Sequence, residues 1–144
     1  MMRVFALILM TVGLISPAVA GEGGPPPLSD YVGHSPFERV AGVAFLEHPA
    51  VRAAVRRAVT DPKVRKWLLV ASTSPSPQIF LKDGVIVSSG CQWHACGERN
   101  WAILIDPEGR HAQVCYYNGS GDGARWYAGD GRSAMRDEGC PFGP

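Results

Sequence analysis

The residues with the greatest chemical potential lie in one short segment, Gly90-Cys91-Gln92-Trp93-His94-Ala95-Cys96-Gly97. Two cysteines and a histidine this close together could bind a metal ion, carry out thiol–disulfide chemistry or form a cross-linked loop. Cys91-x-x-His94-x-Cys96 is not a usual zinc-ligand spacing, and a fourth ligand would have to come from far away in the chain. Redox-active cysteine pairs are typically separated by two residues, whereas four intervene here. The spacing therefore favours a structural disulfide between Cys91 and Cys96.

Such a disulfide leaves two interpretations of the segment. In the first, the bond staples the end of a hairpin, and His94 is an ordinary exposed residue. In the second, the six residues from Cys91 to Cys96 form a rigid, protruding ring closed by the disulfide. His94 lies near its apex with Trp93 beside it, and the flanking glycines allow the sharp turns. A rigid loop loses little entropy on binding, so the second interpretation predicts insertion into a partner's cleft.

The remaining cysteines are Cys115 and Cys140. In an oxidising compartment, an even number of cysteines predicts two disulfides, for which three pairings are possible. The short spacing of Cys91 and Cys96 suggests that they pair locally, which leaves Cys115 to pair with Cys140. In the chain-entropy description, closing the longer loop would stabilise the fold by about 3 kcal/mol.

The elements that must position the loop follow from apolar periodicity and turn residues. Three helices are predicted: one beginning at Ser35-Pro36-Phe37-Glu38 and running to Phe45, one over residues 51–59, and one beginning at Asp61-Pro62. The chain then changes to β-type runs over residues 78–81, 85–88, 101–105, 113–117 and 125–128, with turn residues between them. Residues 131–144 show no clear period. We expect an α+β domain, with N-terminal helices packed on an antiparallel β-sheet and the disulfide-closed loop protruding between strands.

The N-terminal residues 1–20 have the pattern of a secretory signal peptide. Arg3 precedes an apolar run from Val4 to Ile15, and Ala18-Val19-Ala20 offers small residues for cleavage. Residues 21–30, rich in glycine and proline, are predicted to be a disordered leader. Residues 31–144 then form a single exported domain.

The charge balance argues against several classes of partner. The formal net charge is +1 and falls to zero when the segment containing Arg3 is removed, which predicts no overall attraction to nucleic acid or to an anionic membrane. Arg52, Arg56 and Arg57 are predicted to form a solvated helix face. No nucleophile–base pair stands out, and His34, His48 and His111 are interpreted as structural or solvated. We therefore expect a binding protein without a cofactor or resident metal, and not an enzyme.

The segment Cys91-Gln92-Trp93-His94-Ala95-Cys96-Gly97 resembles the signature of the inhibitor of vertebrate lysozyme (Ivy) family, which reads Cys-Lys-Pro-His-Asp-Cys followed by Gly. The resemblance extends loosely over residues 30–130 and includes Trp101-Ala102-Ile103-Leu104-Ile105 after the loop. It implies a periplasmic lysozyme inhibitor whose loop fills the active-site cleft. In such a complex His94 would be the key inhibitory residue, because it would contact the catalytic carboxyl groups, and Cys91 and Cys96 would hold its geometry.

This sequence departs from the family signature at three positions of the loop. Gln92 replaces lysine, Trp93 replaces proline, and Ala95 replaces the aspartate next to the histidine. The loop is therefore bulkier and lacks its local charges. Two alternatives stay open: a diverged envelope protein that binds another peptidoglycan-cleaving enzyme, such as a lytic transglycosylase, and a metal-binding module that uses the Cys/His loop. The sequence does not predict the oligomeric state.

Overall fold

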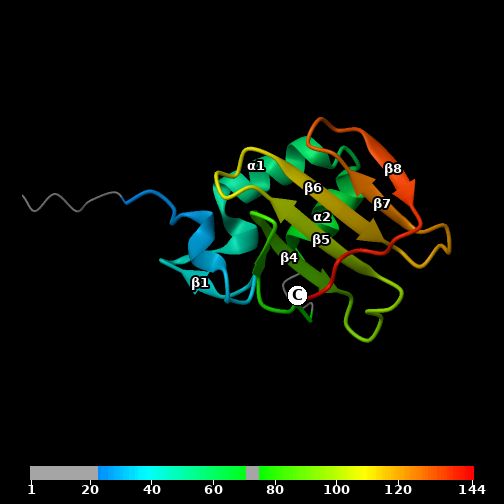
Figure 1. Cartoon of the computed structure of the whole chain (residues 1–144), viewed down its shortest axis with the longest axis horizontal. Helices are drawn as coiled ribbons and strands as arrows, with labels where there is room; N and C mark the ends of the chain where they lie inside the picture. The colour runs from blue at the N-terminus through cyan, green and yellow to red at the C-terminus, as the bar shows by residue number, and fades with distance from the viewer. Residues whose placement is uncertain (1–22, 71–74) are drawn as a thin grey trace, which may run out of the picture.

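The computed structural model describes residues 23–70 and 75–144, so the predicted signal peptide at residues 1–20 lies outside the described part. The described chain is an α+β structure in which two helices lie on one side of an antiparallel sheet (Figure 1). The helices are α1 (Pro49–Ala58) and α2 (Pro62–Val70). The sheet is a meander with the strand order β3-β4-β5-β6-β7-β8. Its strands are β3 (Phe80–Lys82), β4 (Val85–Cys91), β5 (Asn100–Ile105), β6 (Ala112–Tyr117), β7 (Ala124–Tyr127) and β8 (Ser133–Arg136).

Both helices begin where the sequence supplies a cap. In α1, Pro49 occupies the first turn and the His48 ring accepts a hydrogen bond from the Ala50 amide over 3.1 Å. In α2, the Asp61 carboxylate accepts from the amides of Lys63 and Val64. The apolar side chains then repeat at three- and four-residue spacings and are buried against the sheet; they are Val51, Ala54, Val55, Ala58, Val64 and Leu68.

The sheet has a different apolar cover on each face. Alternation along the strands sends Ile86, Trp101, Ile103, Ile105 and Val114 into the main core with the helices. The intervening residues form a smaller cluster on the other face, comprising Ala102, Cys115, Ala124 and Trp126. Cys140 packs on this second cluster and is joined to Cys115 by a disulfide. The C-terminal residues are thereby fixed to the centre of the sheet.

The prediction of a helix from Ser35 to Phe45 is wrong. These residues form the hairpin of β1 (Arg39–Val40) and β2 (Val43–Ala44), followed by a 3-10 helix over Phe45–Glu47. Ala41 and Gly42 both have positive φ, 46° and 84°, which is the backbone of a two-residue hairpin turn and cannot continue an α-helix. The apolar residues that suggested a helical period contribute to the core from this hairpin and from the 3-10 helix.

The predicted disordered leader is also wrong for its second half. Leu28–Tyr31 form a 3-10 helix, and Pro26 and Leu28 are buried. His48 explains this order: its Nδ1 accepts from Ala50, so its Nε2 carries the proton and donates to the carbonyl of Pro26 over 3.0 Å. His48 is only 6% exposed and is structural. The prediction of a disordered leader was based on composition, which does not reveal the hydrogen bond between His48 and Pro26.

Candidate binding loop

The candidate site is the connection between β4 and β5. These strands pair from Ile86 with Ile105 to Cys91 with Asn100, and the chain then leaves the sheet over residues 92–99. Figure 1 shows this connection extending past the end of the sheet. Except for half-buried Ala95, every residue from 92 to 99 is exposed. The protrusion therefore stands on two strands that are paired over six residues each.

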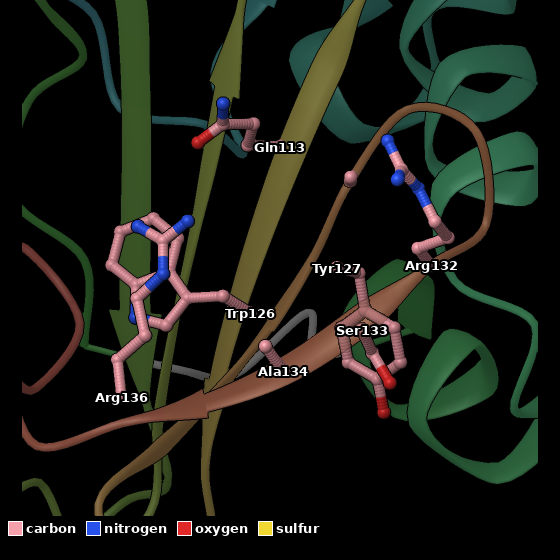
Figure 2. A pocket seen from close by; sticks show the side chains of 8 residues that line it. Gln113, Trp126, Tyr127, Arg132, Ser133, Ala134 and Arg136 are labelled. Atoms are coloured by element: carbon pink, nitrogen blue, oxygen red, sulfur yellow. The ribbon is translucent and has the colours of Figure 1, made fainter.

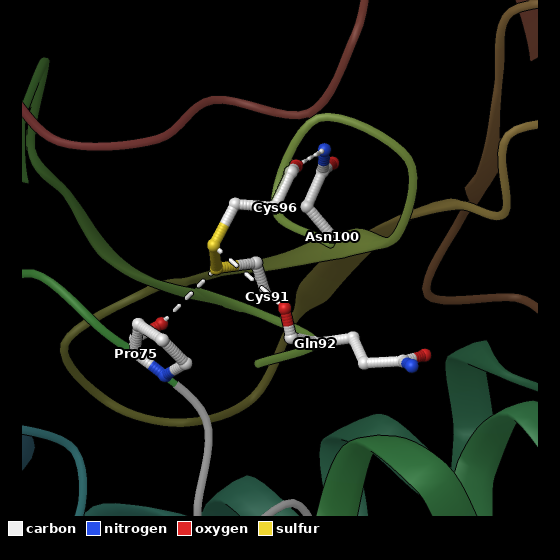
Figure 3. The surroundings of a disulfide bond; sticks show 5 residues. All are labelled: Pro75, Cys91, Gln92, Cys96 and Asn100. Carbon is white, nitrogen blue, oxygen red and sulfur yellow. Dashed lines mark hydrogen bonds between the residues drawn. A yellow bond between two sulfur atoms is a disulfide. The ribbon is translucent and has the colours of Figure 1, made fainter. Parts of the chain in front are cut away.

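The base of the loop is closed by the disulfide between Cys91 and Cys96 (Figure 3). Cys91 is buried, its amide donates to the carbonyl of Pro75 over 3.2 Å, and its sulfur lies 3.6 Å from the same oxygen. On the other side, the Asn100 amide group donates to the carbonyl of Cys96 over 2.9 Å. Both cysteines are therefore tied to neighbouring backbone as well as to each other.

The apex of the loop is a β-turn with Trp93 and His94 at its two central positions. The carbonyl of Gln92 accepts a hydrogen bond from the amide of Ala95 over 2.9 Å, which closes the turn. His94 has φ of 62°, as the third residue of a type II turn requires. Histidine enters this left-handed region more readily than most residues, but it remains an uncommon conformation that surrounding contacts must hold.

A second set of hydrogen bonds braces the loop from below. The carbonyl of Ala95 accepts from the amides of Glu98 and Arg99, over 3.0 and 2.7 Å, and the amide of Gln92 donates to the carbonyl of Arg99. The Arg99 guanidinium also donates to the side-chain oxygen of Gln92 over 3.1 Å. Gln92 was predicted to belong to the target-binding loop. Its side chain makes this hydrogen bond within the loop. Arg99 and Asn100 were not predicted, because they lie outside the ring closed by Cys91 and Cys96.

Trp93 and His94 are the exposed pair at the apex. Trp93 is 60% exposed, and its ring meets the His94 ring edge to face with centroids 5.2 Å apart. The contact restricts both side chains while leaving their outer surfaces accessible. The apex therefore offers an apolar surface and an imidazole side by side.

His94 differs from the other histidines of the described chain in its free ring nitrogens. The ring of His34 pairs with Glu38 over 2.9 Å, and that of His111 pairs with Asp106 over 2.9 Å. The ring of His48 is bonded at both nitrogens, as described above. Within residues 23–70 and 75–144, no hydrogen bond or ion pair engages the His94 ring. Its donor and acceptor capacity is thus available to a partner.

The structure removes the basis for the metal-binding alternative. All four cysteines are in disulfides, so no thiolate remains to ligate a metal. Among the described residues, no group of three or more His, Cys, Asp or Glu side chains is arranged to hold a metal ion.

The described chain also contains a pocket of about 330 Å³ on β7 and β8, where Arg136 lies over the Trp126 ring (Figure 2). It shares no residue with the loop.

Comparison with known proteins adds one match. The family model described as Inhibitor of vertebrate lysozyme (Ivy) matches residues 50–135. The matched segment begins in α1, reaches β8 and contains the whole disulfide-closed loop. No curated protein and no solved structure matches the chain.

Proposed function

Because the chain belongs to the family of inhibitors of vertebrate lysozyme, we propose that it inhibits a lysozyme by inserting the 91–96 ring into the catalytic cleft, with His94 leading. Membership of an inhibitor family supports the general role. The observation that carries the proposed mechanism is the exposed pair of Trp93 and His94 at the tip of a braced ring. Members of this family are periplasmic, and the signal peptide predicted at residues 1–20 agrees with that location.

The chemistry of the target explains why a histidine suits this position. Retaining glycosidases hold two carboxyl groups roughly 5–5.5 Å apart, and one of them has a raised pKa that lets it act as the acid. An imidazole has one nitrogen on each side of the ring and can engage two such groups together. Hydrogen bonds to a carboxylate in a cleft that excludes water are strong. His94 would therefore block the two groups that perform the reaction.

The rigidity of the loop supports the same proposal. Ordering a mobile loop on binding costs free energy for every residue that becomes fixed. Here the disulfide, the turn at Gln92–Ala95 and the bonds from Arg99 and Asn100 fix the loop before any partner arrives. The free energy of contact with the target then goes into affinity.

Trp93 stands where the family signature has proline, so the loop of this chain has an aromatic ring beside the histidine. Ala95 carries no carboxylate that could orient the neighbouring histidine. In this chain, the edge-to-face contact with Trp93 limits the rotation of the His94 ring. We infer that Trp93 is a positioning residue for His94 and also adds apolar contact area at the mouth of the cleft.

An inhibition assay with matched variants tests the proposal. Oxidised protein spanning residues 21–144 is titrated into a vertebrate-type lysozyme that is degrading cell walls, alongside His94→Ala and His111→Ala. The parent and His111→Ala should inhibit equally, because His111 is exposed and lies outside the loop. His94→Ala should inhibit at least about 30-fold more weakly, as expected for a central contact residue.

Two results would contradict the proposed mechanism. No inhibition by the folded, oxidised parent would exclude vertebrate-type lysozyme as the target. Equal inhibition by the parent and His94→Ala would exclude the histidine mechanism even if the protein is an inhibitor. The same titration into a lytic transglycosylase identifies the alternative target, since inhibition of that enzyme alone would reassign the partner.

A further inference from the structure

The helical part of the chain concentrates positive charge. Residues 49–70 contain six cationic side chains and a single carboxylate, whereas the rest of the sequence has eight cationic side chains and twelve carboxylates. The six cations are Arg52, Arg56, Arg57, Lys63, Arg65 and Lys66. Both helices lie on the same side of the sheet (Figure 1). The near-zero net charge of the protein therefore conceals a strongly cationic layer on one side.

One stripe of this layer combines cations with exposed apolar groups. Lys63, Lys66, Trp67 and Val70 follow one another at the spacing that places residues on one face of a helix, and together they line a shallow hollow of about 360 Å³. We define these four residues as the α2 face. Val70 is 64% exposed, although the opposite side of the same helix buries Val64 and Leu68 in the core.

The α2 face is held in place but has no charge partner of its own. The Trp67 ring packs edge to face on Tyr116, with centroids 5.4 Å apart, so its orientation is fixed by the sheet. Neither Lys63 nor Lys66 takes part in an ion pair within the described residues. Two unpaired ammonium groups therefore flank an aromatic ring and an exposed valine.

We propose that the α2 face docks on an anionic phospholipid surface. Lysines beside tryptophan and an exposed aliphatic residue are the combination that interfacial helices present to lipid headgroups. Lysine stems lie along the apolar surface while their ammonium groups reach the phosphates. A bilayer accepts the cations and the exposed valine without a shaped pocket, whereas an acidic protein surface would have to supply a pocket that fits the valine. None of the described helices has the length and apolarity needed to cross a membrane.

Docking of the α2 face differs from the expectation, based on net charge, that the protein is not attracted to an anionic membrane. A neutral total predicts no long-range attraction to a membrane, but a surface charge acts within the screening length of about 8 Å at physiological salt. At that range the cationic helix layer, and not the whole-chain charge, determines the interaction. The α2 face shares no residue with the 91–96 ring, and membrane docking does not depend on lysozyme inhibition.

Flotation with vesicles tests the proposal on the oxidised 21–144 protein. We expect binding to vesicles that contain phosphatidylglycerol, none to vesicles of phosphatidylcholine alone, and release at 0.5 M salt (roughly a 4 Å screening length). Lys66→Gln should weaken binding about five-fold, the contribution of one cation near an anionic surface. Lys82→Gln is the matched control, because Lys82 is an exposed lysine on β3, outside the helix layer, and it should change binding little.

A second matched pair tests the apolar contact. Val70→Ser removes the aliphatic group without adding a charge and should reduce binding more than Leu81→Ser, the same change at a comparably exposed aliphatic site on β3, where the exposed fraction is 56%. Absence of binding to the anionic vesicles would overturn the proposal. Equal effects of Lys66→Gln and Lys82→Gln would overturn it too. A loss with Lys66→Gln but none with Val70→Ser would overturn the proposed apolar contact, because binding would then be electrostatic alone.

Discussion

Asn100 is connected to both cysteines of the loop: it is the register partner of Cys91 at the end of β4 and β5, and its side chain donates to the carbonyl of Cys96 over 2.9 Å. One residue of the rigid sheet thus fixes both ends of the ring that carries His94. The disulfide alone would close the ring but would leave it free to tilt against the strands. The Asn100 contact makes the ring a continuation of the sheet.

Replacing Asn100 should weaken inhibition without removing a group that faces the target. Asn100→Ala leaves the Cys96 carbonyl without this donor, so part of the order of the ring must be gained on binding. We expect the inhibition constant to rise by about three- to ten-fold, corresponding to about 1 kcal/mol for one hydrogen bond. Inhibition titrations and hydrogen exchange at the loop amides check this. Unchanged inhibition together with faster exchange would show that loop order does not contribute to affinity.

Loss of the disulfide between Cys115 and Cys140 should mainly lower stability, whereas loss of the disulfide between Cys91 and Cys96 should mainly lower inhibition. Cys115→Ala/Cys140→Ala opens the long loop that fixes the C-terminal residues and should lower the free energy of unfolding by about 3 kcal/mol, while the folded variant still inhibits. Cys91→Ala/Cys96→Ala opens a six-residue ring, so it should cost less stability and should reduce inhibition much more. Denaturant unfolding and inhibition titrations compare the pairs. The reverse order of effects would contradict the assignment of the short ring to binding.

Two neighbouring glycines provide a stability test of the loop between β6 and β7. Gly121 and Gly123 both have positive φ, 80° and 84°, but a Cβ at Gly123 would overlap the carbonyl of Arg136 whereas one at Gly121 would meet open space. Gly121→Ala should therefore cost about 1 kcal/mol for the backbone conformation alone. Gly123→Ala should cost several kcal/mol, because β8 must move as well. Thermal or urea unfolding measures both, and equal losses would mean that β8 is not packed against Gly123 as described.

The Asp106 carboxyl group should make the stability of the fold depend on pH in the acidic range. Burial alone would raise the pKa of Asp106, but the amides of Arg110 and His111 and the His111 ring donate to the carboxylate, and the pKa is lowered overall. A carboxyl group with a lowered folded-state pKa adds stability above its unfolded pKa, near 3.9, and this contribution disappears as the pH falls through the folded-state value. Asp106→Asn should lower the free energy of unfolding at pH 7 by about 1 kcal/mol. The difference from the parent should shrink on acidification below pH 4, and a difference that stays constant would contradict this role.

Much of the fold could be predicted because its signals are local. Helices α1 and α2 have caps and an apolar face, and the five β-runs with their turn residues correspond to β3–β7. The hairpin at residues 39–44 was missed because Phe37, Val40, Ala44 and Phe45 are also spaced as in a helix, and only the positive φ at Ala41 and Gly42 separates the two. Strand β8 has four exposed side chains and therefore no alternation for a sequence to show.

The site could be predicted in part for the same reason. The ring and its histidine are contiguous in the sequence, and the spacing of Cys91 and Cys96 is enough to indicate a closed loop. The bracing contacts are not local in this sense: Asn100 and Arg99 act because β5 returns beside β4. The contact between Trp93 and His94 depends on the turn that places both residues at the apex. Such roles become visible only with the register of the strands and the hydrogen bonds of the loop.

The most direct test of the central claim is competition for the catalytic cleft. The affinity of the oxidised 21–144 protein for a vertebrate-type lysozyme is measured by titration calorimetry, with and without a saturating oligosaccharide fragment of the glycan substrate. If the 91–96 ring occupies the cleft, the apparent Kd should rise in proportion to the oligosaccharide concentration, because only one of the two can bind at a time. Formation of a ternary complex, with the Kd unchanged at saturating oligosaccharide, would contradict insertion of the loop into the cleft.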